Sequence, residues 1–326
     1  MVTPRARRAA RDVDLSVRLG PLQLKNPVVT ASGTFGYGLE FKPYLDLGRL
    51  GGMVTKGLSL RPRPGNAPPR TCETPSGMLN AIGLANIGVD AFVDEKLPEL
   101  RQHDIVIIAN VFGETLEEYV AVARRLNGAR GLHAIELNLS CPNTAKGGLA
   151  FGVSPPVIRK VVAAVRRASP DLVLIVKLTP NITDVAVAAR AAKEGGADVL
   201  SLVNTFLGMS VDLEQRRPIL DNVVGGLSGP AIKPLALYMV HRVHREVDLP
   251  IMGMGGIVSA RDALEFMITG SAAVQVGTAN FLDPGAAIRI LEGIEAYCRE
   301  REIHALREIV GTLQVPERGP LPACGI

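Results

Sequence analysis

The chain has 326 residues, of which 47% are hydrophobic and 21% charged, and its formal net charge is +4. This composition excludes a disordered or collagen-like chain and leaves enough apolar residues for a large core. The four cysteines, Cys72, Cys141, Cys298 and Cys324, are too far apart for a metal-binding motif, and we expect neither a bound metal nor a disulfide framework.

The first residues are basic, with four arginines between Arg5 and Arg11. We interpret residues 1–14 as a solvated, flexible tail; a transit peptide or a nucleic-acid-binding arm is the alternative, which the acidic Asp12 disfavours. No apolar segment follows the arginines as a secretory signal would require, and no run of about 18 apolar residues could span a bilayer. We therefore expect a cytoplasmic protein without membrane contact, with residues 15–326 forming one domain.

Short apolar runs alternate with amphipathic stretches along the rest of the chain. A small hairpin is expected first, over Leu15–Gly20 and Leu22–Lys25. Eight runs then have the length and composition of buried strands: Val28–Ala31, Gly52–Thr55, Ile105–Asn110, Ala134–Leu139, Leu172–Leu178, Val199–Asn204, Pro250–Gly253 and Ala273–Gly277. Helices with apolar residues at three- and four-residue spacing are expected over Glu114–Leu126, Pro155–Ala168, Asp184–Glu194, Ala231–Glu246, Arg261–Thr269 and Gly285–Arg299.

This alternation of strands and helices indicates an α/β fold with parallel strands and right-handed crossovers. Eight strands favour a closed (β/α)8 TIM barrel with a short N-terminal β-hairpin, and a doubly wound open sheet is the alternative. One connection, from Leu58 to Gln102, is too long for a plain β/α unit. Because long loops in compact domains are often functional, we interpret it as an active-site insertion.

Polar residues follow five consecutive strands where each strand ends. They are Thr55 with Lys56, then Asn110, Asn138, Lys177, and Asn204 with Thr205. In the fourth strand, alternation predicts that Glu136, Asn138 and Ser140 face the barrel axis. A single asparagine after a strand is often only a turn residue, but the repeated pattern predicts an active site at the carboxyl end of the barrel.

The last two strands are followed by glycines instead. Gly255-Gly256 and Gly277-Thr278 stand where barrels often bind phosphate, and a further glycine-rich loop spans Gly225–Pro230. Glycine lets the backbone approach phosphate oxygens closely. We favour a phosphate-bearing cofactor over simple turns.

Cys141 lies just past the fourth strand, in the segment Asn138–Asn143. A buried cysteine is usually a small hydrophobic residue, but the polar neighbours at the active end favour a reactive role. A thiol with an ordinary pKa of about 8.5 can act as a general base at mildly alkaline pH. With no histidine nearby, we do not expect a thiol protease.

Taken together, these motifs resemble those of the class 1 dihydroorotate dehydrogenases, and within them the type 1B catalytic (FMN) subunit. The resemblance runs from about Leu15 to about Ala287. The matching segments, in order, are Val54–Gly57, Asn80–Leu84, Ala109–Gly113, Asn138–Asn143, Val176–Leu178, Val203–Thr205, Gly225–Pro234, Gly255–Ile257 and Gly277-Thr278. The related membrane-associated class 2 enzymes use serine where this chain has Cys141.

The resemblance implies a flavoprotein that oxidises dihydroorotate to orotate in pyrimidine biosynthesis. Cys141 would take the proton from C5 while C6 gives a hydride to FMN. The implied FMN contacts are Ser32, Lys56, Gly57, Asn110, Asn138, Lys177, Val203, Gly229, Gly255, Gly256, Gly277 and Thr278. The implied substrate contacts are Lys56, Asn80, Ala81, Ile82, Gly83, Leu84, Asn138, Asn204 and Thr205.

Type 1B also implies a heterotetramer: a homodimer of this chain with two partner subunits that carry FAD and an iron–sulfur cluster and pass electrons to NAD+. Three alternatives remain at this point. Two are related flavin barrels, a dihydropyrimidine dehydrogenase-like enzyme and a tRNA dihydrouridine synthase. The third is a non-redox phosphate-binding barrel, which would bind no flavin.

Overall fold

The structure, a computed structural model, describes residues 13–140 and 152–316. Most of the predicted basic tail, Cys141 and the end of the chain lie outside the described residues. Among the described residues, no helix is long and apolar enough to cross a membrane.

Eight parallel strands close into a barrel, as predicted. Around the barrel their order is β3, β4, β7, β8, β9, β10, β15 and β16, with β16 pairing back onto β3. The bounds are β3 Val28–Thr30, β4 Gly52–Val54, β7 Val106–Val111, β8 Ala134–Asn138, β9 Val173–Lys177, β10 Val199–Leu202, β15 Ile251–Met254 and β16 Ser271–Val276. The predicted doubly wound alternative is wrong, because an open sheet would leave two strand edges unpaired.

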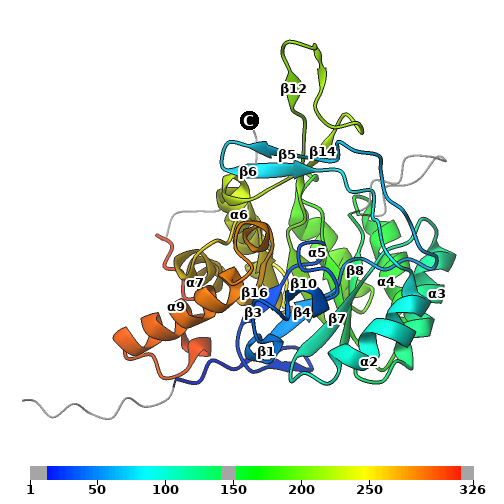
Figure 1. Ribbon diagram of the computed structural model, residues 1–326. Helices are drawn as coiled ribbons and strands as arrows, with labels where there is room; N and C mark the ends of the chain where they lie inside the picture. Colours follow the sequence, from blue (N-terminus) through cyan, green and yellow to red (C-terminus); the bar gives the residue numbers. More distant parts are fainter. Residues whose placement is uncertain (1–12, 141–151, 317–326) are drawn as a thin grey trace, which may run out of the picture.

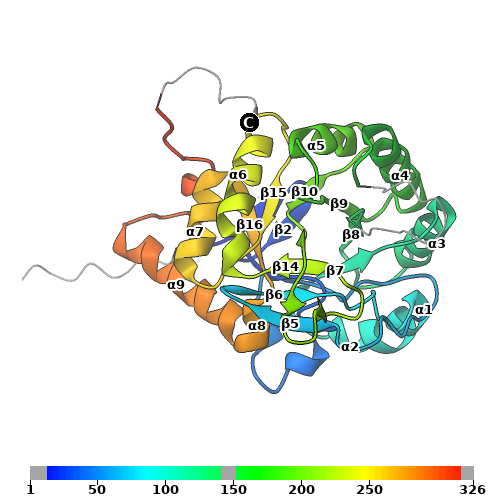
Figure 2. The ribbon, with the colours of Figure 1, turned by 90° about the horizontal axis from the view of Figure 1, so that it is seen from above.

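The helices form a ring outside the barrel, seen from above in Figure 2. The six predicted helices are α3 Leu116–Asn127, α4 Pro155–Ala168, α5 Val185–Glu194, α6 Lys233–His244, α7 Ala260–Thr269 and α9 Ala286–Glu300. Their ends follow local chemistry. Proline stands in the first turn of α4, and the Asp184 side chain caps α5 by accepting a hydrogen bond from Ala186 N at 3.0 Å. The short helix α8, Ala279–Leu282, was not predicted.

The N-terminal hairpin, β1 Val17–Leu19 and β2 Leu22–Leu24, lies at the end of the barrel away from the site (Figure 1). Its alternate residues Val17, Leu19, Leu22 and Leu24 are buried, and they belong to the main hydrophobic core. Burying these side chains closes the bottom of the barrel against water.

A second sheet lies over the opposite end of the barrel (Figure 1). Its order is β11-β14-β6-β5, and all its neighbouring strands are antiparallel. The strands are β5 Thr71–Thr74, β6 Gly77–Asn80, β11 Phe206–Gly208 and β14 Gly225–Ser228, and a small ribbon, β12 Val211–Asp212 with β13 Arg217–Pro218, extends beyond them. The long insertion after β4 therefore contains half of this sheet. It also contains α1 Val89–Ala91, a π-helix over Phe92–Lys96 and α2 Leu97–Leu100, which were not predicted.

Candidate active site

The predicted polar residues meet at the carboxyl end of five neighbouring strands. Asn110 lies in β7, Asn138 and Lys177 are the last residues of β8 and β9, and Lys56 and Asn204 each follow their strand by two residues. Asn110 and Lys177 are almost fully buried, at 1% and 5% exposure. A buried lysine at a barrel mouth carries a desolvation cost, so it marks a site where a charge is useful.

Glu136 of β8 is the centre of a buried polar layer inside the barrel. One carboxylate oxygen accepts a hydrogen bond from Asn110 Nδ2 at 2.7 Å and lies 3.8 Å from Lys177 Nζ. The other accepts from Ser201 Oγ at 2.9 Å and Gln275 Nε2 at 2.5 Å. Alternation along β8 correctly predicts that Glu136 faces inward. It was not among the predicted site residues, because its partners come from four other strands.

Asn138 joins β8 to the loop after β10. Its Oδ1 accepts hydrogen bonds from Ser140 N at 3.1 Å and Asn204 Nδ2 at 3.4 Å. Its backbone carbonyl accepts a hydrogen bond from the Tyr119 hydroxyl at 2.8 Å. Asn204 Oδ1 in turn accepts from Thr205 N at 2.9 Å. The structure therefore brings the predicted residues Asn138, Asn204 and Thr205 together. It also leaves the buried Ser140 hydroxyl without a hydrogen-bond partner among the described residues.

Lys56 and Gly57 stand beside Asn110. The Gly57 backbone packs so closely that an added Cβ would lie 3.1 Å from Asn110 Oδ1. Lys56 is half-buried; burial and then the positive charge of Arg70 lower the pKa of its ammonium below the ordinary 10.5, while Glu40 opposes the shift. Lys56 forms no ion pair with any described residue. Such a lysine favours a bound anion, because the anion would supply the missing counter-charge.

The predicted substrate segment, residues 80–84, runs from the end of β6 and is held on both sides. Asn80 Nδ2 donates to Gly226 O of β14 at 3.2 Å. Asn66 donates to Ala81 O at 2.9 Å from its side chain and to Ile82 O at 3.0 Å from its backbone. Gly83 and Leu84 both have positive φ, 70° and 59°. A leucine in this conformation is uncommon, which is typical of a segment whose shape is fixed by its surroundings.

The glycines after β15 and β16 meet the loop before α6. Gly255, Gly256 and Gly229 have φ of 129°, 73° and 98°. A Cβ on Gly256 would lie 2.8 Å from Gly229 O, so only glycine fits there. After the neighbouring strand β16, Thr278 Oγ1 donates to Ser228 Oγ at 2.8 Å. The backbone amides of Gly256, Gly277 and Thr278 donate no hydrogen bond to any other described residue, so they are available to an anion.

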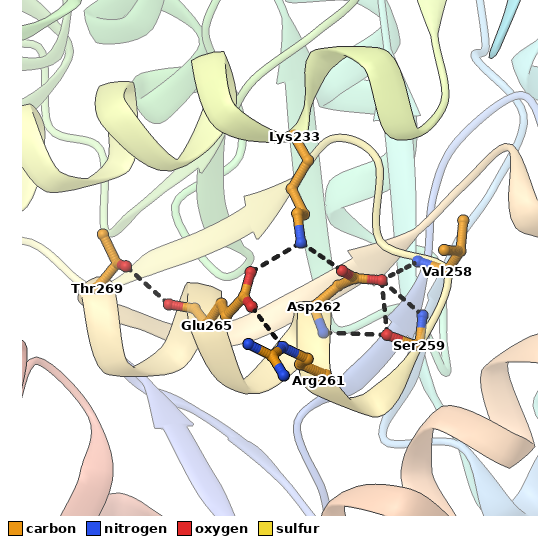
Figure 3. Close-up of polar contacts among 7 residues, drawn as sticks. All are labelled: Lys233, Val258, Ser259, Arg261, Asp262, Glu265 and Thr269. Carbon is orange, nitrogen blue, oxygen red and sulfur yellow. Dashed lines mark hydrogen bonds and ion pairs between the residues drawn. The ribbon is translucent and has the colours of Figure 1, made fainter. Parts of the chain in front are cut away.

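An ion-pair cluster holds the loop that follows β15, and Figure 3 shows it. Lys233 Nζ, at the start of α6, contacts Asp262 Oδ1 at 2.6 Å and Glu265 Oε2 at 2.8 Å. The other Asp262 oxygen accepts from the backbone of Val258 and Ser259 at 3.1 and 2.9 Å, and Ser259 caps α7. Burial opposes ionisation of Asp262, but hydrogen bonds from Lys233 and Ser259 lower its pKa. Two carboxylates thus balance the charge of Lys233, and one of them, Asp262, also holds the loop backbone in place.

Two predicted flavin contacts, Ser32 and Val203, have surroundings that do not by themselves indicate a ligand. Ser32 is half-buried in the loop after β3. Val203 is buried, and its backbone N donates to Met254 O at 3.1 Å. Cys141 lies outside the described residues. No cluster of three or more histidine, cysteine or acidic residues that could hold a metal occurs in the part of the chain that the structure describes.

The arrangement fits a flat, phosphate-bearing cofactor. Free backbone amides and glycines stand at one side of the barrel mouth. Toward the barrel axis are an unpaired buried acceptor, Asn110 Oδ1, and the buried ammonium of Lys177, which donates no hydrogen bond to a described residue. Buried polar groups normally find partners, so these groups point to a ligand with complementary donors and acceptors.

The comparisons with known proteins agree with this arrangement. A family model described as dihydroorotate dehydrogenase matches residues 14–298. The chain is 56% identical over 302 residues to a protein of Geotalea daltonii, and 54% identical over 302 residues to one of Geobacter sp. (strain M21); each match covers 93% of this chain and 99% of the relative. A protein of Thermoanaerobacter sp. (strain X514) is 51% identical over 303 residues, which are 93% of this chain and 100% of the relative. All three relatives are named dihydroorotate dehydrogenase B (NAD(+)), catalytic subunit.

Proposed function

The chain belongs to the dihydroorotate dehydrogenase family, and from this premise we propose which of its residues carry the activity. It is an oxidoreductase that oxidises dihydroorotate to orotate in pyrimidine biosynthesis. The observation that carries the assignment of residues is the meeting of Lys56, Asn110, Asn138, Lys177 and Asn204 at one end of the barrel. The rival flavin barrels and the non-redox barrel are not favoured by these relatives.

FMN is the proposed cofactor, and when bound it supplies the acceptor for the hydride that leaves C6 of dihydroorotate. Its phosphate would be held by the amides of Gly255, Gly256, Gly277 and Thr278, with Gly229 closing the loop. Lys177 and Asn110 would hold the ring, where the lysine charge favours the reduced form. The remaining proposed contacts are Ser32, Lys56, Gly57, Asn138 and Val203.

Dihydroorotate is a small ring with imide groups and a carboxylate, so it needs a cation and several amides. Lys56 is the proposed partner of the carboxylate, because it is half-buried and unpaired among the described residues. Asn138, Asn204 and Thr205 would bind the imide edge, and residues 80–84 would close over the ring. Asn80 and Thr205 suit this because both lie against Gly226 of β14.

Cys141 is the proposed general base that takes the proton from C5 of the substrate. It directly follows Ser140, whose buried hydroxyl has no partner among the described residues. A thiol can do this without a histidine partner, because the proton leaves the substrate carbon in step with the hydride.

The words "catalytic subunit" in the relatives' names imply a partner subunit. We propose that this partner carries FAD and an iron–sulfur cluster, that it passes electrons to NAD+, and that two of each chain form a heterotetramer. We also propose that residues 15–326 act as one domain and that the enzyme works in the cytoplasm.

The test is the visible spectrum of the purified chain before and after anaerobic addition of dihydroorotate. Flavin absorption bands that bleach on addition are the expected result. Bands that persist would show that dihydroorotate does not reduce the flavin, and would favour another dihydropyrimidine as the substrate. A colourless protein that cannot be reconstituted with FMN would refute the proposed cofactor.

A further inference from the structure

We infer that Glu136 is a positioning residue of the flavin site: its carboxylate fixes the Asn110 amide as a hydrogen-bond acceptor and supplies the counter-charge of Lys177. The inference rests on the proposed FMN site and deepens it. Glu136 does not touch the cofactor in this proposal, because both of its oxygens are occupied by other side chains.

The two oxygens of Glu136 have different hydrogen-bond partners. Oε2 accepts from Ser201 and Gln275, and Gln275 Nε2 also lies 3.1 Å from Met252 Sδ within the core. Oε1 faces the proposed site, where it meets Asn110 and Lys177. The carboxylate is fully buried, at 0% exposure. Three hydrogen-bond donors and one cation surround this carboxylate, and these partners offset the cost of burying it.

The charge of Glu136 determines which way the Asn110 amide points. An ionised carboxylate only accepts hydrogen bonds, so the NH2 group of Asn110 must face it. The 2.7 Å contact from Nδ2 meets this requirement, and Oδ1 is left buried without a partner among the described residues. At the proposed cofactor site this acceptor is available to a donor from a ligand, and the N3–H of the flavin ring is such a donor.

Lys177 is charge-paired but keeps its hydrogen bonds free. Its Nζ is 3.8 Å from Glu136 Oε1, which is close enough for strong attraction but too far for a hydrogen bond. The ammonium donates to no described residue, although its side chain is only 6% exposed. The side chains of Lys177 and Asn110 therefore meet the same carboxylate oxygen, and together they offer a donor and an acceptor that complement the acceptor and donor groups along the pyrimidine edge of a flavin.

The experiment compares the reduction potential of bound FMN in the whole chain and in Glu136→Gln. Glutamine keeps the shape of glutamate but removes one negative charge beside Lys177. We expect the potential to become more positive, with the equilibrium constant for reduction rising at least tenfold, or about 30 mV for a two-electron couple. Ser201→Ala is the matched control, because it removes a donor to the same carboxylate without changing its charge. Its potential should equal that of the wild type.

The second variant, Glu136→Asp, keeps the charge but withdraws the carboxylate by one methylene from Asn110. We expect a potential near that of the wild type and FMN binding weakened at least tenfold, measured by titration. If Glu136→Gln does not fold, Glu136→Asp still tests whether Glu136 positions Asn110. A Glu136→Asp variant that binds FMN as tightly as the wild type would overturn the inference.

The outcomes separate this inference from the proposed function. A wild-type chain that takes up no FMN overturns both. A wild-type chain that binds FMN, together with a Glu136→Gln variant of unchanged potential, overturns only the role of Glu136. Equal shifts in Glu136→Gln and Ser201→Ala would also overturn it, because a merely structural role of the network predicts that result.

Discussion

Gly256→Ala tests whether the glycines after β15 form the phosphate site. Gly256 has φ of 73°, which costs an L-residue about 1–2 kcal/mol. The new Cβ would also lie 2.8 Å from Gly229 O and 3.1 Å from Lys233 N, both backbone atoms that cannot rotate away. Forcing extra atoms into packed structure costs about 1–3 kcal/mol. Alanine also restricts the unfolded chain, which offsets about 0.4–1 kcal/mol of this cost, so we expect a net loss of about 1–4.5 kcal/mol.

Alanine substitutions at two other glycines separate the conformational cost from the steric cost. Gly33 has φ of 83° but no atom within 4 Å of an added Cβ, so Gly33→Ala carries only the conformational cost, about 1 kcal/mol net. Gly277→Ala carries neither cost, because its φ is not positive and the nearest atom, Ala31 Cβ, lies at an ordinary 3.4 Å. Only the effect on the unfolded chain remains, so this variant should be more stable than the wild type by about 0.4–1 kcal/mol.

Urea unfolding of the three variants measures their free energy of unfolding, and FMN titration measures their affinity for the cofactor. We expect stability to fall in the order Gly277→Ala, Gly33→Ala, Gly256→Ala, with unchanged m-values. FMN affinity should fall at least tenfold in Gly256→Ala, because relieving the contact with Gly229 O moves the backbone amides proposed to hold the phosphate. It should stay near the wild-type value in Gly277→Ala, where the added methyl group has room. Wild-type FMN affinity in Gly256→Ala would refute the phosphate site, and a Gly256→Ala variant as stable as Gly33→Ala would refute the steric argument.

Three further predictions follow from the site. Burial and the positive charge of Arg70 lower the pKa of Lys56, so its charge is lost at a lower pH than usual and the KM for dihydroorotate should rise at alkaline pH. This rise should vanish in Lys56→Arg. Identical pH profiles of KM in the two proteins would exclude Lys56 as the partner of the substrate carboxylate. Cys141→Ser should lower turnover at neutral pH by about 10²–10⁴-fold with FMN still bound, because a hydroxyl is a far poorer base; near-normal turnover would exclude Cys141. Asp262→Asn should lose about 1–3 kcal/mol of stability and bind FMN more weakly, because Asp262 holds Val258 and Ser259 as well as Lys233. Glu265→Gln is the control, because Glu265 contacts the same lysine but not the loop. Equal losses of FMN affinity in the two variants would contradict the role of Asp262 in holding the loop.

The barrel could be predicted from the sequence because each strand is buried on both faces. Runs such as Ile105–Asn110 and Leu172–Leu178 are apolar except for Asn110 and Lys177 near their ends, and their bounds differ from those of β7 and β9 by only one residue. The site residues at strand ends could be predicted for the same reason: once parallel strands close, their carboxyl ends must meet. The positions of Asn110 and Lys177 therefore follow from the fold.

The sheet above the barrel could not be predicted in this way. Its pairing of β6 with β14 joins segments about 146 residues apart, as in the bond from Asn80 to Gly226. The strands are three or four residues long, and β5 alternates between exposed and half-buried residues without a buried face. Such segments carry no apolar period, and their stability comes from partners that the local sequence does not contain.

The two lysines at the barrel mouth differ in a way that separates the proposed ligands. Lys177 stands next to Glu136, so the pair adds no net charge and suits the neutral oxidised ring of a flavin. Lys56 has no ion pair among the described residues, and Arg70 adds positive charge nearby. A carboxylate would gain more at Lys56 than at Lys177, because at Lys177 it would also face the negative charge of Glu136. In this proposal the negative charge of Glu136 therefore has a second effect: it favours binding of the substrate carboxylate at Lys56 rather than at Lys177.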